Sequence, residues 1–333
     1  MYIILCFSFI ICIDVKTTSG VVRGRTLHVL NNTVNQFLNI PYAEPPIGNL
    51  RFAPPVPLKQ PLNYVINDTK RGKACIQVQS RIMKGEVSED CLVLNIWTPN
   101  AGNNNTNKSQ LKPIMFWIHG GALVFGSMNT YNGSFLAAHD VVFVAANYRL
   151  GQLGFLYGDR EDAPGNVGFY DQLLALKWVR ENAEQFGGDR DQMTIFGESA
   201  GSWSVSAHIL SPLSKGLFKR AIMQSGSAMW GKGRETITKS EALVMAKNSA
   251  KHFNCSESED WLQCLRRVNA LEILKTQSKV MFPVFDTIFL PISTQKAFES
   301  KKLYSGLLSL EIVKGNNIDV DDYDQCSMGE PYN

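Results

Sequence analysis

The chain has 333 residues, of which 44% are hydrophobic and 19% charged, and its formal net charge is +3. These proportions are those of an ordinary globular protein and exclude a disordered chain. The small net charge, with no block of Lys and Arg, argues against a nucleic-acid partner, and no residue pattern calls for a cofactor or a metal.

The first residues, from Met1 to Ile13, are almost all apolar, and a polar segment follows them. A run of this length is too short to cross a membrane as a helix. It predicts a secretory signal peptide over residues 1–16, although no Lys or Arg precedes the apolar run and no small-residue cleavage site is clear. The alternative is a buried first strand.

Cysteines and glycosylation sequons agree with secretion. Without the leader, two local loops, Cys75 with Cys91 and Cys255 with Cys264, are the simplest oxidised arrangement and leave Cys326 over. Free buried thiols are the alternative if the chain has no leader. The N-x-S/T sequons are at Asn31, Asn67, Asn104, Asn107, Asn132 and Asn254.

Elements alternate along the rest of the chain. Pro41–Pro57 is too rich in proline for regular structure, so we expect it to wrap the surface. Continuous apolar runs then predict strands that are buried on both faces. These strands cover residues 92–97, 114–118 and 141–146, and a polar loop over residues 100–110 separates the first two.

Helical spacing of apolar residues predicts a helix over residues 170–186, which Gly187 and Gly188 end. A strand over 193–196, a helix over 202–209 and a strand over 221–224 follow. Strands that alternate with helices predict an α/β fold with a mostly parallel sheet, in one domain.

Residues 197–201 read Gly-Glu-Ser-Ala-Gly, a G-x-S-x-G pattern between the strand over 193–196 and the helix over 202–209. In this context a serine sits on a tight turn, and its hydroxyl projects as a nucleophile. Gly197 and Gly201 would let the strand and the helix approach closely around Ser199. Chance occurrence in a chain rich in serine and glycine is the bland alternative.

Several further segments accompany this turn in order, namely Glu89–Asn95, Asn147–Arg149 and Gly165–Gln172. With them the chain resembles the type-B carboxylesterase and cholinesterase family of α/β-hydrolases, from the end of the leader to about Asn317. The resemblance implies an α/β-hydrolase domain over residues 17–333, with a central, mostly parallel sheet flanked by helices.

The resemblance also implies that Ser199 forms the acyl-enzyme of a serine carboxylesterase. Backbone N–H groups of Gly121, Ala122 and Ala200 would form the oxyanion hole. Cys75–Cys91 and Cys255–Cys264 match two disulfides of the family.

The other members of a catalytic triad are less clear. Gly315–Asp321 corresponds to the family's acid segment, but Val320 occupies the position of the glutamate. Asp319 is the first candidate to replace it, with Asp321 or Asp322 as alternatives, unless all three are simply solvated surface residues.

In this family the catalytic histidine follows the acid along the chain. The five histidines here all precede it, and we interpret His119 as structural. We therefore expect the chain to be a piece of the family's domain, without its C-terminal part and the catalytic histidine. The remaining histidines are His28, His139, His208 and His252.

The sequence also bears on the substrate, and it leaves two other hypotheses about the protein open. Residues Ile76–Asp90 include no aromatic side chain, although a choline cation is held by the face of an aromatic ring. A neutral, apolar small-molecule ester therefore fits better than acetylcholine. A non-catalytic secreted binding or adhesion protein on the same fold is the second hypothesis, and a truncated product that does not fold stably is the third.

Overall fold

The computed structural model describes residues 12–67, 72–78, 85–102, 110–227, 237–255, 260–276, 281–300 and 309–313. Its strands are β1 (Cys12–Thr17), β2 (Gly20–Val29), β3 (Asn32–Pro41), β4 (Ala74–Cys75), β5 (Val87–Ser88), β6 (Val93–Thr98), β7 (Lys112–Ile118), β8 (Val142–Ala146), β9 (Tyr157–Arg160), β10 (Ala163–Pro164), β11 (Gly188–Glu198), β12 (Arg220–Gln224) and β13 (Ser309–Val313). Its α-helices are α1 (Ser134–Ala137), α2 (Gly151–Phe155), α3 (Val167–Glu181), α4 (Ala200–Leu210), α5 (Lys239–His252), α6 (Trp261–Arg267), α7 (Ala270–Ile273) and α8 (Thr294–Glu299). Short 3₁₀ turns are η1 (Gly48–Leu50), η3 (Met128–Thr130), η4 (Glu184–Phe186), η5 (Pro212–Ser214) and η6 (Leu274–Thr276).

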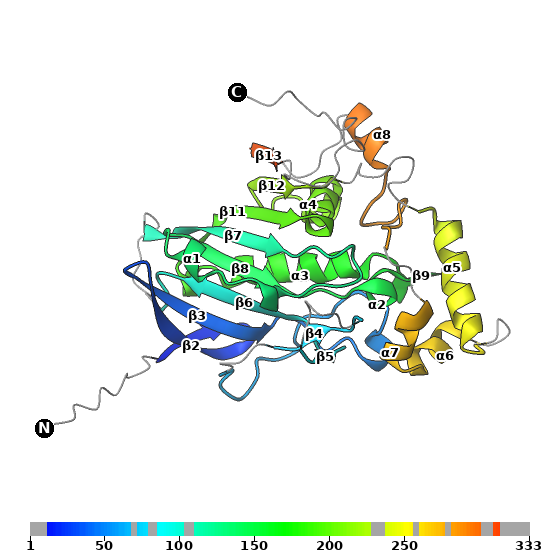
Figure 1. Cartoon of the computed structure of the whole chain (residues 1–333), viewed down its shortest axis with the longest axis horizontal. Helices are drawn as coiled ribbons and strands as arrows, with labels where there is room; N and C mark the ends of the chain where they lie inside the picture. The colour runs from blue at the N-terminus through cyan, green and yellow to red at the C-terminus, as the bar shows by residue number, and fades with distance from the viewer. Residues whose placement is uncertain are drawn as a thin grey trace, which may run out of the picture.

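A nine-stranded sheet runs through the molecule in the order β1-β2-β3-β6-β8-β7-β11-β12-β13. The pairs from β8 to β13 are parallel, as the alternation of strands and helices predicts. The pairs from β1 to β8 are antiparallel, so the sheet is mixed rather than mostly parallel. Figure 1 shows β7 and β11 side by side, with their arrowheads directed toward the side where α5, α6 and α7 gather.

The antiparallel half begins with β1, β2 and β3, which the sequence analysis did not predict. Leu30 and Asn31, with φ angles of 48° and 63°, join β2 to β3 in the left-handed conformations that a two-residue hairpin turn requires. Such tight turns connect only antiparallel strands. Strand β1 includes residues 12–16 of the predicted leader, whose other residues lie outside the described part of the chain.

The predicted strands and helices are present, with shifted ends. Strands β6, β7, β8 and β12 begin and end within two residues of the predicted limits. Strand β11 begins at Gly188, five residues early. Helix α3 begins at Val167, three residues early, and ends at Glu181 rather than at residue 186, because η4 follows it. The Pro41–Pro57 segment has no regular structure beyond η1 and the last residue of β3, as expected.

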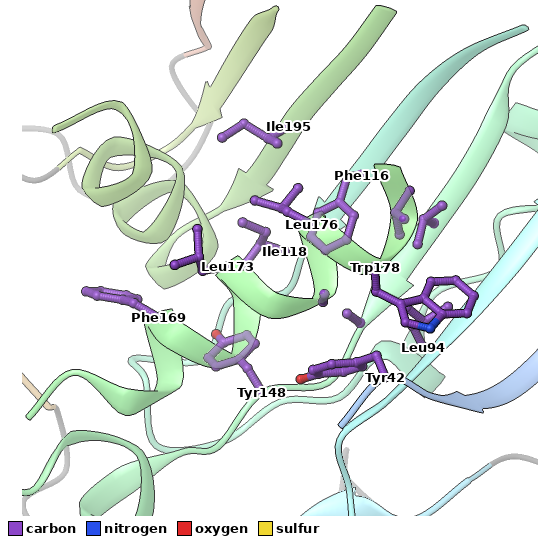
Figure 2. Close-up of a cluster of buried hydrophobic side chains, with 14 of the residues drawn as sticks. Tyr42, Leu94, Phe116, Ile118, Tyr148, Phe169, Leu173, Leu176, Trp178 and Ile195 are labelled. Carbon is purple, nitrogen blue, oxygen red and sulfur yellow. The ribbon is translucent and has the colours of Figure 1, made fainter. Parts of the chain in front are cut away.

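The main core lies between the sheet and α3. Phe169, Leu173 and Leu176 recur along α3 at helical spacing and are buried. Figure 2 shows them facing Phe116, Ile118 and Ile195 of β7 and β11. Burial of each leucine or phenylalanine side chain stabilises the fold by about 1.5–3 kcal/mol, which fixes α3 against the strands that carry the candidate site.

A smaller core holds α5, α6 and α7 together and includes Cys255 of the second disulfide. Helix α5 opens with a capping box, in which Thr238 and Glu241 bond to each other's backbone N–H groups. In the described part of the chain, no helix has both the length and the apolar character needed to cross a bilayer.

Candidate active site

Ser199 stands on a strained turn between β11 and α4. Its φ of 55° and ψ of −121° lie where a residue with a side chain rarely sits. Two backbone hydrogen bonds hold the turn, one from the Ser199 N–H to the Gln224 carbonyl at 3.0 Å and one from the Trp203 N–H to the Ser199 carbonyl at 3.0 Å. The predicted strand–turn–helix arrangement around this serine is therefore present.

The two glycines of the turn lie where backbones meet. A Cβ atom at Gly197 would be 2.6 Å from the carbonyl carbon of Gly201 and 2.7 Å from the carbonyl oxygen of Ile118. A Cβ atom at Gly201 would collide with the backbone of Ile118 as well. Helix α4 can pack this closely on β7 and β11 only because both positions lack a side chain.

The segment after β7 packs against this turn. A Cβ atom at Gly120 would be 3.3 Å from the Ser199 Cβ and 2.6 Å from the Glu198 carbonyl oxygen. Gly121, Ala122 and Leu123 follow with φ angles of 113°, 55° and 61°, three consecutive residues in conformations that favour glycine. Strained backbone of this kind gathers at functional sites.

Three backbone N–H groups of this segment and of the Ser199 turn have no acceptor among the described residues. In the part of the chain that the structure describes, the N–H groups of Gly121, Ala122 and Ala200 donate no hydrogen bond. Ala200 is also the first residue of α4, whose N-terminal dipole favours negative charge there. The three predicted oxyanion donors therefore remain available near Ser199.

His119 is a structural residue in this fold. Its side chain is 1% exposed and stacks on Tyr148, with ring centroids 4.4 Å apart. The Nδ1 atom lies 3.0 Å from the Gly120 carbonyl oxygen, so it carries the proton and donates. Burial lowers the pKa of His119 to about 4, which keeps the ring neutral.

His208 on α4 belongs to a buried hydrogen-bond chain. The Ser214 hydroxyl donates to its Nδ1 at 2.8 Å, and its Nε2 donates to the Gln172 Oε1 at 3.1 Å. The Gln172 amide then donates to Ser204, whose hydroxyl donates to the carbonyl of Ala200. Burial lowers the pKa of His208 to about 3, so this ring fixes α4 against α3 as a neutral group.

The other histidines are exposed. His139 lies just before β8, and His28 lies near the β2–β3 turn. Both are therefore at the opposite end of the strands from Ser199, which follows the last residue of β11. A hydrogen bond from Asn32 to the carbonyl of Ala138 joins these two regions. His252 ends α5 and contacts Phe253. Among the described residues, no hydrogen bond joins Ser199 to any histidine.

The candidate acids cannot be placed. Asp319, Asp321, Asp322 and Val320 lie outside the described residues, as does Cys326. Glu198, next to Ser199, faces solvent beside Gly120, and partial burial raises the pKa of its carboxyl. No described hydrogen bond connects Glu198 with the Ser199 hydroxyl.

The other motif residues support the scaffold. Arg149 and Asp171 form a buried ion pair, in which the Arg149 Nε and Nη2 donate to the two Asp171 oxygens at 2.8 and 2.7 Å. Arg51 makes a similar pair with Glu89. Asn166 takes a left-handed conformation and bonds to the backbone of Val284 at both ends of its amide.

Both expected disulfides, Cys75–Cys91 and Cys255–Cys264, are present. A cavity of about 10 Å³ beside the first is lined by Arg51, Glu89 and Arg149, among others. This volume suits one water molecule and is far too small for an ester.

Sequence reasoning missed Gln77, which lies two residues after Cys75. Its amide oxygen accepts from the Gly126 N–H at 2.9 Å, and its Nε2 donates to the Gly126 carbonyl at 2.8 Å. The contact joins the disulfide segment to the end of the loop that carries the oxyanion donors. No local pattern marks a partner 49 residues away.

Comparison with known proteins agrees with this geometry. Residues 12–317 match the family described as the Carboxylesterase family. The chain is 44% identical to carboxylesterase 5A of Felis catus over 86% of its length and 55% of that protein. It is 41% identical to acetylcholinesterase of Gallus gallus over 84% of its length and 38% of that protein, and 42% identical to human cocaine esterase over 86% and 53%.

The chain thus spans about half the length of the curated relatives that it matches, or less. The match nevertheless covers nearly all of the chain and includes the strained serine turn and both disulfides. This chain belongs to the carboxylesterase family and has its α/β-hydrolase fold.

Proposed function

We propose that the protein is a serine carboxylic ester hydrolase that works through an acyl-enzyme at Ser199. The observation that carries the proposal is the strained Ser199 turn, which stands beside unused N–H groups of Gly121, Ala122 and Ala200. A nucleophile and convergent donors around one reacting carbon are what acyl transfer requires.

In the proposed reaction, the Ser199 hydroxyl oxygen attacks the carbonyl carbon of the ester, and its proton passes to a general base. The carbonyl oxygen becomes negative in the tetrahedral intermediate, where the N–H groups bind it. Each such donor contributes roughly 3 kcal/mol to stabilisation of the transition state. The alcohol leaves with the proton from the base, and water then releases the acid by the same route.

The general base is a histidine other than the five of this sequence. Two of the five are buried and neutral with structural partners, and two lie at the opposite end of the strands from Ser199. The fifth, His252, ends α5 and contacts Phe253, and no hydrogen bond among the described residues joins it to Ser199. Asp319 remains the candidate acid that would orient such a base, with Asp321 and Asp322 as alternatives. Sequencing the transcript past the codon for Asn333 asks whether a longer product carries a histidine after the acid.

The proposed substrate is a neutral, apolar carboxylic ester. The disulfide loop between Cys75 and Cys91 contains no aromatic side chain that could hold a choline cation. The matched relatives include an acetylcholinesterase and a carboxylesterase, so their names alone do not choose between a choline ester and a neutral ester.

The proposed location is outside the cell. The apolar run at the start of the chain and the two disulfides support it, because such a run is typical of a secretory leader and disulfides persist in oxidising compartments.

Steady-state hydrolysis by the product that carries the proposed histidine base tests the function. We expect 4-nitrophenyl butyrate to be hydrolysed with a higher kcat/KM than butyrylthiocholine, since only the second needs a cation site. The variant Ser199→Ala should lose at least about 10³-fold of the activity toward the neutral ester. Equal rates for wild type and Ser199→Ala would reject the enzyme and favour a binding protein on the same fold.

A further inference from the structure

The donor-bearing segment is a closed loop, from His119 to Gly126. A Cβ atom at Gly126 would collide with the Gly120 carbonyl and with the His119 ring, so the two ends of the loop touch. Inside the loop, the Gly121 carbonyl accepts from the N–H groups of Val124 and Phe125 at 2.9 and 3.0 Å. Gly121 and Ala122 therefore sit in a small ring of backbone. Backbone N–H groups of Met281 and Gly151 donate to the carbonyls of Ala122 and Leu123 at 3.1 and 2.7 Å, in the middle of the loop.

Gln77 holds the loop at the point where it closes. Besides its two bonds to Gly126, its Nε2 donates to the Cys75 carbonyl at 3.0 Å. Gln77 is 2% exposed; its bond to Cys75 is buried, and its two bonds to Gly126 are partly buried. A primary amide suits this position, because its oxygen accepts from the backbone N–H while its nitrogen donates to the carbonyl of the same residue.

The disulfide segment anchors Gln77 in turn. Cys75 is bonded to Cys91, and β4 pairs with β5 beside it. The side chain of Asn147 extends the contact, because its amide donates to the Lys73 carbonyl and accepts from the Met128 N–H. The segment over residues 72–77 thus lies along the segment over 126–129.

We infer that Gln77 is a positioning residue, which holds the loop from His119 to Gly126 so that the Gly121 and Ala122 N–H groups face the reacting oxygen. This inference rests on the proposed function for its chemical consequence, but the hold on the loop can be measured without it. A misplacement of about 1 Å at a reacting centre can cost 10²-fold in rate.

The variant Gln77→Ala tests the inference in two readouts, both on the product that carries the proposed histidine base. Hydrogen exchange at the Gly126 amide should accelerate at least about 10-fold, because its acceptor is gone. The second-order rate of labelling of Ser199 by a fluorophosphonate should fall by about 10²-fold, since the same donors stabilise the phosphonyl oxygen. Gln36→Ala is the matched control, a buried glutamine on β3 that accepts from Arg25, and it should change neither.

Gln77→Glu separates positioning from packing, because its shape is nearly that of glutamine. The ionised carboxylate can still accept from the Gly126 N–H, but it places a negative charge against the Gly126 and Cys75 carbonyls, which should open the contact. Burial should raise the pKa of this carboxyl, and the protonated acid can donate to the Gly126 carbonyl. Protection of the Gly126 amide in this variant, corrected for intrinsic exchange, should therefore recover as the pH falls from 7 to 5. Wild type should show no such recovery.

The outcomes are distinct. Unchanged exchange in Gln77→Ala, or faster exchange with unchanged labelling, would overturn the inference. If wild type itself takes up no probe at Ser199, the proposed function fails, and the exchange data alone decide whether Gln77 holds the loop. If Gln77→Ala does not fold, the pH dependence of Gln77→Glu carries the decision.

Discussion

A methyl group at Gly197 should disturb the candidate site more than it disturbs the fold. The added carbon would be 2.6 to 2.7 Å from three backbone atoms of Gly201 and Ile118, short of an ordinary 3.4 Å contact by 0.7 to 0.8 Å. None of these atoms belongs to a flexible side chain, so β11, β7 and α4 must separate. Overpacking of this kind typically costs about 1–3 kcal/mol of stability.

The same shift moves Ser199 relative to its donors. A displacement approaching 1 Å should slow fluorophosphonate labelling of Gly197→Ala by roughly 10- to 100-fold. Urea denaturation would measure the loss of stability, and rapid sampling of probe uptake would measure the labelling rate.

Gly216→Ala is the control for lost stability alone. Gly216 is exposed, its φ is 75°, and a Cβ there would meet no heavy atom within 4 Å. Its substitution should cost about 1 kcal/mol in backbone strain and leave labelling unchanged. Wild-type labelling in Gly197→Ala, or equal slowing in both variants, would refute the reasoning.

Three further predictions concern the scaffold and the surface. Arg149→Met should lower the free energy of unfolding in urea by about 3–5 kcal/mol, because it strands the buried Asp171 carboxylate, and Arg149→Met with Asp171→Leu should recover part of that loss. Between pH 6 and pH 4 the free energy of unfolding should fall as the pH falls, because the unfolded chain binds protons on His119 and His208 whereas their folded pKa values are about 4 and about 3. His208→Gln should reduce the slope of this free energy against pH by about 1.4 kcal/mol per pH unit. An unchanged slope would contradict the conclusion that His208 is buried and neutral. After secretion from a eukaryotic host, mass spectrometry before and after glycosidase treatment should find sugar at the exposed Asn31, Asn67 and Asn132 but none at Asn254, whose neighbour Cys255 is buried in a disulfide.

The sequence predicted the parallel half of the fold because its signals are local. Apolar runs mark β6, β7 and β8, and the G-x-S-x-G pattern fixes the turn between β11 and α4. Strands β1, β2 and β3 were not predicted, because β1 overlaps the expected leader and β2 mixes charged with apolar residues. Helix α5 had a readable signal, the Thr238–Glu241 capping box, that was not used.

The same distinction between local signals and long-range contacts holds for the candidate site. Ser199, the glycines around it and the three donors could be located from short motifs and the family resemblance. The hold of Gln77 on Gly126 and the hydrogen-bond chain from Ser214 through His208 depend on tertiary contacts. Patterns within a window of sequence carry no information about such long-range partners.

The central claim is that Ser199 is an activated nucleophile. The most direct measurement incubates the product that carries the proposed histidine base with a fluorophosphonate, digests it and locates the adduct by tandem mass spectrometry, with Ser199→Ala in parallel. We predict one adduct, on Ser199, and none in the variant. An unlabelled wild-type protein, or an adduct that forms equally in Ser199→Ala, would contradict the claim.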